Sequence, residues 1–182
     1  MSHRNKTYIA FASENLSHYW LMKAWRQNEH ADFDFFNAHD LYEARGSLSP
    51  ETIKRQLRER LNNTRQVILL GSEDGRRKGG DGDSFLAYEI EVILELDLPI
   101  VIANLCQSRD IVAENIPQPL LDHNHFNVSV PFQPKIIRYA LDNYVGGYGK
   151  VRCRGPIGMC NGSMMSWGCD GLYQGRPVYV IT

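Results

Sequence analysis

Residues 84–105, with the sequence SFLAYEIEVILELDLPIVIANL, predict a helix that is followed directly by a buried strand. Apolar side chains recur at helical spacing through the first half of this stretch, which predicts one buried stripe. They are Phe85, Leu86, Ile90, Ile93, Leu94 and Leu96. Pro99 ends the helix, and residues 100–105 form a short apolar strand. Glu89 lies in the first turns of the helix beside this stripe, where it is either a functional acid or an ordinary surface glutamate.

Strands and helices alternate along the chain on both sides of this unit. Strands are predicted at residues 7–13, 33–37, 65–72 and 126–130, and helices at residues 17–25, 49–62 and 134–144. Ser17 and Ser49 are the predicted N-caps of the first two helices, with Pro50 at the first position of the second. Residues 73–83 are polar and rich in glycine, which predicts a mobile loop. The alternation predicts an α/β fold in which a parallel sheet carries helices on both faces.

Candidate ligand-binding residues follow the first predicted strand, because sheets of this kind bind ligands at the carboxyl ends of their strands. Phe11 and Ala12 can line a pocket for an aromatic base there, although Phe11 is equally suited to the core. Ser13 is a ligand-binding hydroxyl or a loop and capping residue. The helix that carries Glu89 begins after the carboxyl end of the strand at residues 65–72, which places Glu89 at the same edge.

Asn37 and Asp40 hold the corresponding place after the second predicted strand. An amide and a carboxylate there can contact a ribose or a phosphate of a ligand. The same two residue types are common in turns, and turn chemistry explains them as well.

The composition is that of an ordinary globular protein, with 43% hydrophobic and 23% charged residues. A formal net charge of −1 gives no electrostatic reason to expect a nucleic acid or an anionic membrane as a partner. No apolar run approaches the roughly 20 residues that span a bilayer. Residues 1–6 lead into a strand-like run without the apolar core of a signal peptide, so a cytoplasmic protein is expected. Cys153, Cys160 and Cys169 lack the spacing of zinc ligands, so no metal site is expected.

The length of 182 residues suits one domain with a small appendage. Residues 1–145 contain the predicted α/β domain. Residues 146–182 are rich in glycine, contain cysteines and lack a helical period. They form either a C-terminal tail or a small β appendage, in which residues 177–181 resemble a strand.

Two segments match motifs that occur together in a known family. The sequence IAFASEN at residues 9–15 is similar to the first-strand pattern I-S-Y-S-x-x-D, with Ala10 and Ala12 in place of its small polar residues. The sequence LNNTRQVILLGS at residues 61–72 is similar to the helix-to-strand segment of the same family, and this is the closest local match.

A third segment, SFLAYEI at residues 84–90, is similar to the W-x-x-x-E-[IL] element that carries the catalytic glutamate of that family. Phe85 stands where tryptophan is usual. On these motifs, residues 7–144, about three quarters of the chain, resemble the TIR-like domain family. The resemblance is to the branch that includes the NAD-consuming subunit of the bacterial Thoeris antiphage system.

The resemblance implies a flavodoxin-like, TIR-like fold and an enzyme that cleaves NAD+ at its nicotinamide–ribose bond, with Glu89 as the catalytic residue. NAD+ would be the substrate, so no cofactor is implied. The implied substrate-binding residues are Phe11, Ala12, Ser13, Asn37, Asp40 and Phe85. The implied partners are further copies of the chain and a downstream effector protein that senses an ADP-ribose-derived nucleotide. A catalytically silent TIR-like interaction module is the alternative, and the departures at Ala10, Ala12 and Phe85 favour it.

Overall fold

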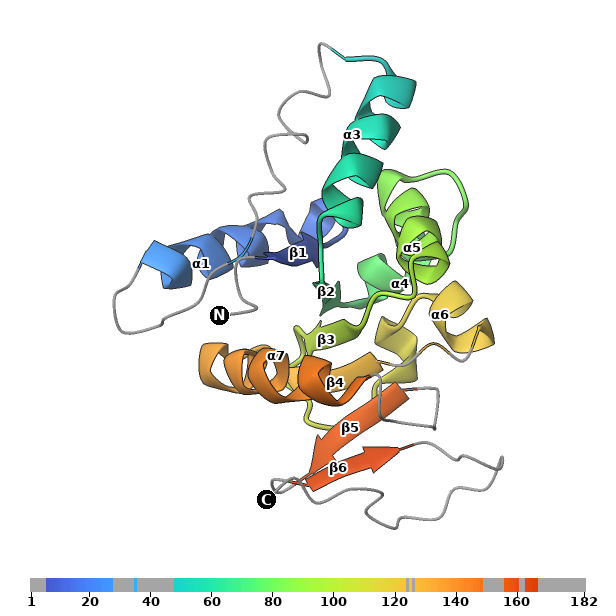
Figure 1. Ribbon diagram of the computed structural model, residues 1–182. Helices are drawn as coiled ribbons and strands as arrows, with labels where there is room; N and C mark the ends of the chain where they lie inside the picture. The colour runs from blue at the N-terminus through green and yellow to red at the C-terminus, as the bar shows by residue number, and fades with distance from the viewer. Residues whose placement is uncertain are drawn as a thin grey trace.

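The computed structural model describes residues 6–27, 35, 48–123, 125, 127–148, 156–160 and 163–166. Within these residues, six strands form one sheet in their order along the chain. They are β1 (Thr7–Ala10), β2 (Gln66–Gly71), β3 (Ile100–Asn104), β4 (Asn127–Pro131), β5 (Pro156–Cys160) and β6 (Ser163–Ser166). Strands β1 to β5 are parallel, and β6 runs antiparallel to β5. The predicted α/β fold around a parallel sheet is confirmed (Figure 1).

Helices cover both faces of the sheet (Figure 1). The first face packs against α1 (Leu16–Gln27) and α7 (Pro134–Tyr148), and the second packs against α3 (Pro50–Asn62), α5 (Phe85–Glu95) and α6 (Gln118–Asp122). Successive side chains of a strand point to opposite faces, so Ile9 enters the α1–α7 core and Tyr8 enters the α3–α5 core. Strands β1 to β4 are buried along their whole length, which explains the nearly continuous apolar sequences of β2 and β3.

The structure confirms one predicted helix start and corrects another. Ser49 caps α3, with its Oγ accepting a hydrogen bond from the Thr52 backbone N–H at 3.3 Å. Helix α1 begins at Leu16, so the prediction of Ser17 as its N-cap is wrong. The chain instead forms a short 3₁₀ turn, η2 (Ser13–Asn15), between β1 and the helix.

Part of the loop predicted at residues 73–83 is a helix, α4 (Glu73–Gly79). The Ser72 side chain caps it by accepting a hydrogen bond from the Gly75 N–H at 2.9 Å. Its buried residues are Gly75 and Gly79, so α4 has no apolar stripe that periodicity could have detected. Gly79 allows the closest packing, because a Cβ there would lie 2.6 Å from Cγ of Pro117.

Several predictions concern residues outside the described ranges. Of the strand predicted at residues 33–37, the structure describes Phe35, which is buried in the α1–α7 core. The strand-like run at residues 177–181 lies wholly outside. Helix α7 continues to Tyr148, past the predicted boundary at residue 145, and that boundary remains a prediction. In the described part of the chain, every helix is too short or too polar to cross a membrane.

Candidate functional site

Glu89 is a buried residue of α5, with 1% of its surface exposed. Its Oε1 accepts a hydrogen bond from the hydroxyl of Tyr8 on β1 at 2.9 Å. Burying a carboxylate is costly unless it is hydrogen-bonded or paired, and here the donor is itself fully buried. The structure therefore excludes the reading of Glu89 as an ordinary surface glutamate.

The start of α5 is fixed by hydrogen bonds to side chains of the preceding loop. Ser84 Oγ accepts from the Ala87 N–H at 3.0 Å and donates to the Lys78 carbonyl at 2.7 Å. Asp81 Oδ1 accepts from the backbone N–H groups of Asp83 and Ser84 at 3.0 and 2.9 Å. These contacts connect the first turn of α5, which precedes Glu89, to the end of α4.

A second set of contacts fastens the η2 turn to the carboxyl end of β2. The Ser72 hydroxyl donates a hydrogen bond to Oδ1 of the buried Asn15 at 2.7 Å. The same hydroxyl caps α4, so a single side chain joins η2, β2 and α4. The carboxyl ends of β1 and β2, where ligands of such sheets bind, are thereby held together.

Charged residues of η2 and α4 form an ion-pair network at the same edge. Glu14 Oε1 lies 3.0 Å from Lys78 Nζ and 3.3 Å from a guanidinium nitrogen of Arg77, which also pairs with Asp74 at 2.7 Å. Lys78 further donates to Ser13 Oγ at 2.8 Å. The hydrogen bond from Lys78 lowers the pKa of Glu14 to about 2.

Three of the predicted site residues lie on the Glu89 side of the sheet or at its rim. Ala12 belongs to the α3–α5 core together with Tyr8. Phe85 is the first residue of α5 and packs, partly buried, against that core. Ser13 is exposed and held by Lys78. The structure thus brings Ala12 and Phe85 to the face that carries Glu89 and places Ser13 at the edge.

The other predicted substrate-binding residues are not brought to Glu89 by the described structure. The Phe11 side chain lies in the α1–α7 core on the opposite face, where its ring stacks on Tyr19 with centroids 4.8 Å apart. This placement favours the core interpretation of Phe11 over the ligand-binding one. Asn37 and Asp40 lie outside the described residues.

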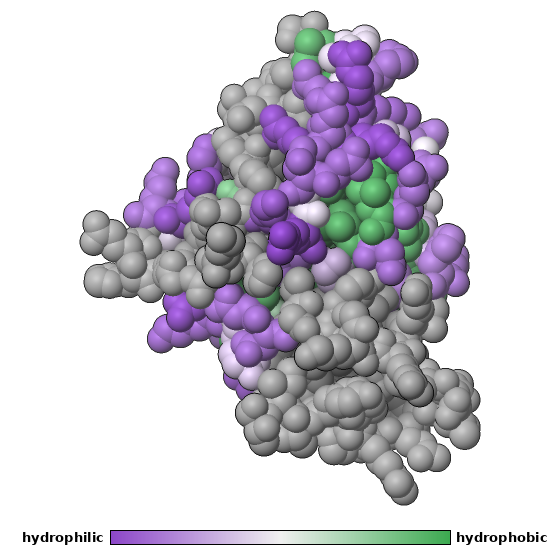
Figure 2. All heavy atoms as spheres, viewed as in Figure 1, coloured by the Kyte–Doolittle hydropathy of each residue, from purple (hydrophilic) through white to green (hydrophobic). Residues whose placement is uncertain are grey.

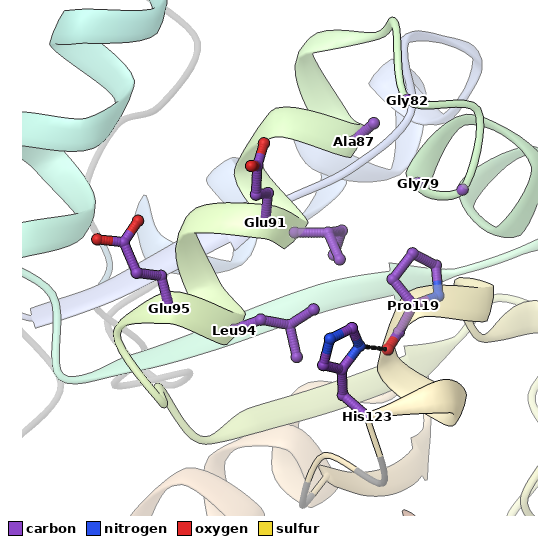
Figure 3. A pocket seen from close by; sticks show the side chains of 10 residues that line it. Gly79, Gly82, Ala87, Glu91, Leu94, Glu95, Pro119 and His123 are labelled. Atoms are coloured by element: carbon purple, nitrogen blue, oxygen red, sulfur yellow. Dashed lines mark hydrogen bonds between the residues drawn. The ribbon is translucent and has the colours of Figure 1, made fainter.

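A separate pocket of about 570 Å³ lies between α5, α6 and the end of α4 (Figure 3). It is lined by Gly79, Gly80, Gly82, Ala87, Ile90, Glu91, Leu94, Glu95, Pro119 and His123. Figure 3 shows Leu94 directed toward His123, while Glu91 and Glu95 point away from it. Figure 2 shows apolar atoms gathered over α5 within a hydrophilic surround. Glu89 does not line this pocket, because it points to the sheet.

Within the described residues, no group of three or more His, Cys, Asp or Glu side chains is arranged to hold a metal ion.

Tyr8 is the site residue that sequence reasoning missed. Its contact with Glu89 joins positions 81 residues apart, which no local pattern reveals. Strand alternation does place Tyr8, Ala10 and Ala12 on the same face, and Tyr8 is the one among the three with a hydrogen-bond donor in its side chain.

A parallel sheet covered by helices on both faces, with a buried glutamate near the start of α5, is the arrangement expected of a TIR-like domain. Residues 8–110, more than half of the chain, match the family described as Thoeris protein ThsB, TIR-like domain. The chain belongs to this antiphage family. No curated protein gives a significant match.

Proposed function

We propose that the protein cleaves NAD+ at the bond between nicotinamide and ribose, with Glu89 as the catalytic carboxylate. The observation that carries the proposal is the buried Glu89 carboxylate, which is held by the Tyr8 hydroxyl at 2.9 Å. Its local sequence is similar to the W-x-x-x-E-[IL] element, and it lies within residues 8–110, which match the Thoeris TIR-like family. Burying a carboxylate costs free energy, which supports a functional rather than a merely structural role for Glu89.

A single carboxylate suffices for this reaction. Breaking the bond develops positive charge on the ribose, as in glycoside hydrolysis. The nicotinamide ring is cationic in NAD+ and departs neutral, so no general acid has to protonate it. Glu89 would stabilise the developing charge on the sugar and orient its hydroxyl groups.

The product depends on the group that attacks the ribose. Attack by water gives ADP-ribose, whereas attack by an atom of the same molecule gives a cyclic isomer, which is favoured where water is excluded. In this proposal an ADP-ribose-derived nucleotide carries the antiphage signal in the cytoplasm to an effector protein. Self-assembly of the chain supports full activity, and NAD+ is a substrate rather than a resident cofactor.

The proposed substrate-binding side extends from Glu89 toward the carboxyl ends of the strands. Ala12 and Phe85 lie on the same face as Glu89, and Ser13 lies at the edge. Asn37 and Asp40 complete the proposed set after the second predicted strand. The ion-pair network around Glu14 holds the η2 turn, which carries Ser13.

The test is product analysis of NAD+ incubated with concentrated protein, with a crowding agent present to promote assembly. Glu89→Gln should reduce the rate of nicotinamide release at least 100-fold. Removing one group that stabilises charge in a transition state typically lowers kcat by about this factor. The fold should persist, because the glutamine carbonyl can still accept a hydrogen bond from Tyr8. Glu91→Gln, an exposed change on the same helix, is the matched control and should keep full turnover.

The mass of the second product separates hydrolysis from cyclisation. Equal turnover by wild type and Glu89→Gln would remove Glu89 from the mechanism. Absence of turnover from the assembled wild type, with and without phage lysate, would favour the catalytically silent interaction module.

A further inference from the structure

We propose that Tyr8 is a positioning residue that holds the Glu89 carboxylate charged and in one orientation for the cleavage of NAD+. This inference rests on the proposed function. It concerns a contact between β1 and α5 that none of the motifs quoted above contains.

The Tyr8–Glu89 contact joins two rigid elements. Tyr8 lies in the β1–β2 ladder, paired with Val67, and its residue surface is 0% exposed. Glu89 lies one turn inside α5, whose first turn is capped by Ser84. Side chains carried by a strand and a helix hold a contact more precisely than side chains on loops, and both side chains here are packed in the core.

On the β1 side of this core, Tyr8 supplies the hydrogen-bond donor. Ala10 and Ala12 share the face with Tyr8, and their side chains end at Cβ. These are the two positions at which the first-strand pattern has serine. In this chain the donor on that face is therefore at position 8, and it reaches Oε1 of Glu89.

Two basic side chains of α3 contact residues of α5 on either side of Glu89 in the sequence. Arg58 donates to Glu95 through both terminal guanidinium nitrogens, Nη1 and Nη2, and these hydrogen bonds raise the pKa of Arg58 above its usual value. Lys54 Nζ lies 5.2 Å from the centroid of the Tyr88 ring. Arg58 and Lys54 thus contact Glu95 and Tyr88, while the Tyr8 hydroxyl contacts the buried Glu89 carboxylate.

The hydrogen bond has two consequences for the reaction. It restricts rotation of the carboxylate about its last torsion, which is otherwise broad. It also favours the charged form, which the reaction requires, against the opposing effect of burial. Both effects act on Glu89, and Tyr8 itself needs no contact with NAD+.

Tyr8→Phe tests the proposal, because it removes the hydroxyl and keeps the ring in the core. We expect kcat to fall about 10- to 100-fold, the size of one hydrogen bond to a charged group, with KM changed by less than about twofold. The acid limb of the pH–rate profile should move to higher pH, because losing a donor favours the protonated carboxyl. Tyr19→Phe removes another buried tyrosine hydroxyl, on the opposite face, and should leave kcat and the profile unchanged. An unchanged kcat in Tyr8→Phe would overturn the proposal.

A titration gives a readout that does not depend on turnover. Carbon-13 labelling of glutamate carboxyl groups, with Glu89→Gln to assign the signal, reports the protonation of Glu89 directly. Its midpoint should lie at higher pH in Tyr8→Phe than in wild type, and equal midpoints would contradict the proposal.

Should Tyr8→Phe fail to fold, 3-fluorotyrosine at position 8 keeps the hydroxyl as a stronger donor and should move the midpoint to lower pH. A wild type that shows this titration but no turnover would refute the proposed function and leave the Tyr8–Glu89 contact established.

Discussion

Gly71, the last residue of β2, is packed too closely for any side chain. A Cβ at this position would lie 2.7 Å from Cγ2 of Ile102 and 3.1 Å from Oδ1 of Asn104. Both neighbours are fully buried in β3 and cannot move aside freely. Gly71→Ala should therefore lower the free energy of unfolding by about 1–3 kcal/mol, as overpacked core sites do. Urea denaturation measures this change.

The matched control for this prediction is Gly80→Ala. A Cβ at Gly80 would meet nothing closer than the Arg76 carbonyl at 3.4 Å, and φ is −116°, which suits any residue. The unfolding free energy should change by less than about 0.5 kcal/mol, as at other surface positions. An equal loss in both variants would show that the effect comes from glycine removal in general rather than from the contact with Ile102.

Single residues could be predicted from the sequence where a local pattern identifies them. Ser49 follows from the cap-and-proline sequence at the start of α3. Glu89 was singled out by the resemblance, because periodicity alone favours an ordinary surface glutamate, whereas the structure buries it. Tyr8 could not be found in this way, because its partner is 81 residues away. The sequence also does not show which core Phe11 enters, because successive side chains of one strand point into two different cores.

At the scale of elements, the η2 turn and α4 are joined by an ion pair whose strength depends on pH. The Lys78 hydrogen bond lowers the pKa of Glu14 from its ordinary value of 4.5 to about 2. A carboxylate with a depressed pKa stabilises the fold above about pH 4.5, and this contribution is lost as the pH falls toward 2. Glu14→Gln should thus melt slightly below wild type at pH 7, and the two melting temperatures should converge between pH 4.5 and 2. The difference is small, because Glu14 is partly exposed.

Glu59→Gln on the exposed side of α3 serves as the control for this pH dependence. Its melting temperature should follow that of wild type at each pH. A Glu14→Gln difference that stays constant from pH 7 to pH 2 would contradict the role assigned to the ion pair. Calorimetric scans at closely spaced pH values distinguish these outcomes.

Elements with an apolar period were predictable from sequence, whereas polar or short ones were not. The helix at residues 85–95 and the strand that follows it carry strong apolar patterns, and both are present. Helix α4 was missed because its sequence, EDGRRKG, has no apolar face and is held by the Ser72 cap and by ion pairs. Helix α6 was missed because it has only five residues, with Pro117 directly before it and Pro119 inside it.

At the scale of the whole molecule, the sheet extends beyond the region that matches the family. The match ends at residue 110, yet β4, β5 and β6 continue the same sheet. Residues 127–129 of β4 pair with residues 156–158 of β5. The sequence did not predict β5 and β6, because this glycine-rich region lacks the alternation that marks a strand.

The pairing of β4 with β5 predicts that the C-terminal hairpin stabilises the whole domain. A chain that ends after Tyr148 would lack β5. The backbone edge of β4 that pairs with β5 would then be exposed, next to the buried side chains of Val128 and Val130. Exposed apolar edges destabilise a sheet and promote edge-to-edge association. We therefore expect a lower urea midpoint and aggregation detectable by light scattering. Ending the chain after Ser166 keeps β5 and β6 and should preserve both properties. If the shorter chain instead showed no aggregation and equal stability, the β5–β6 pair would be an appendage that the TIR-like domain does not need.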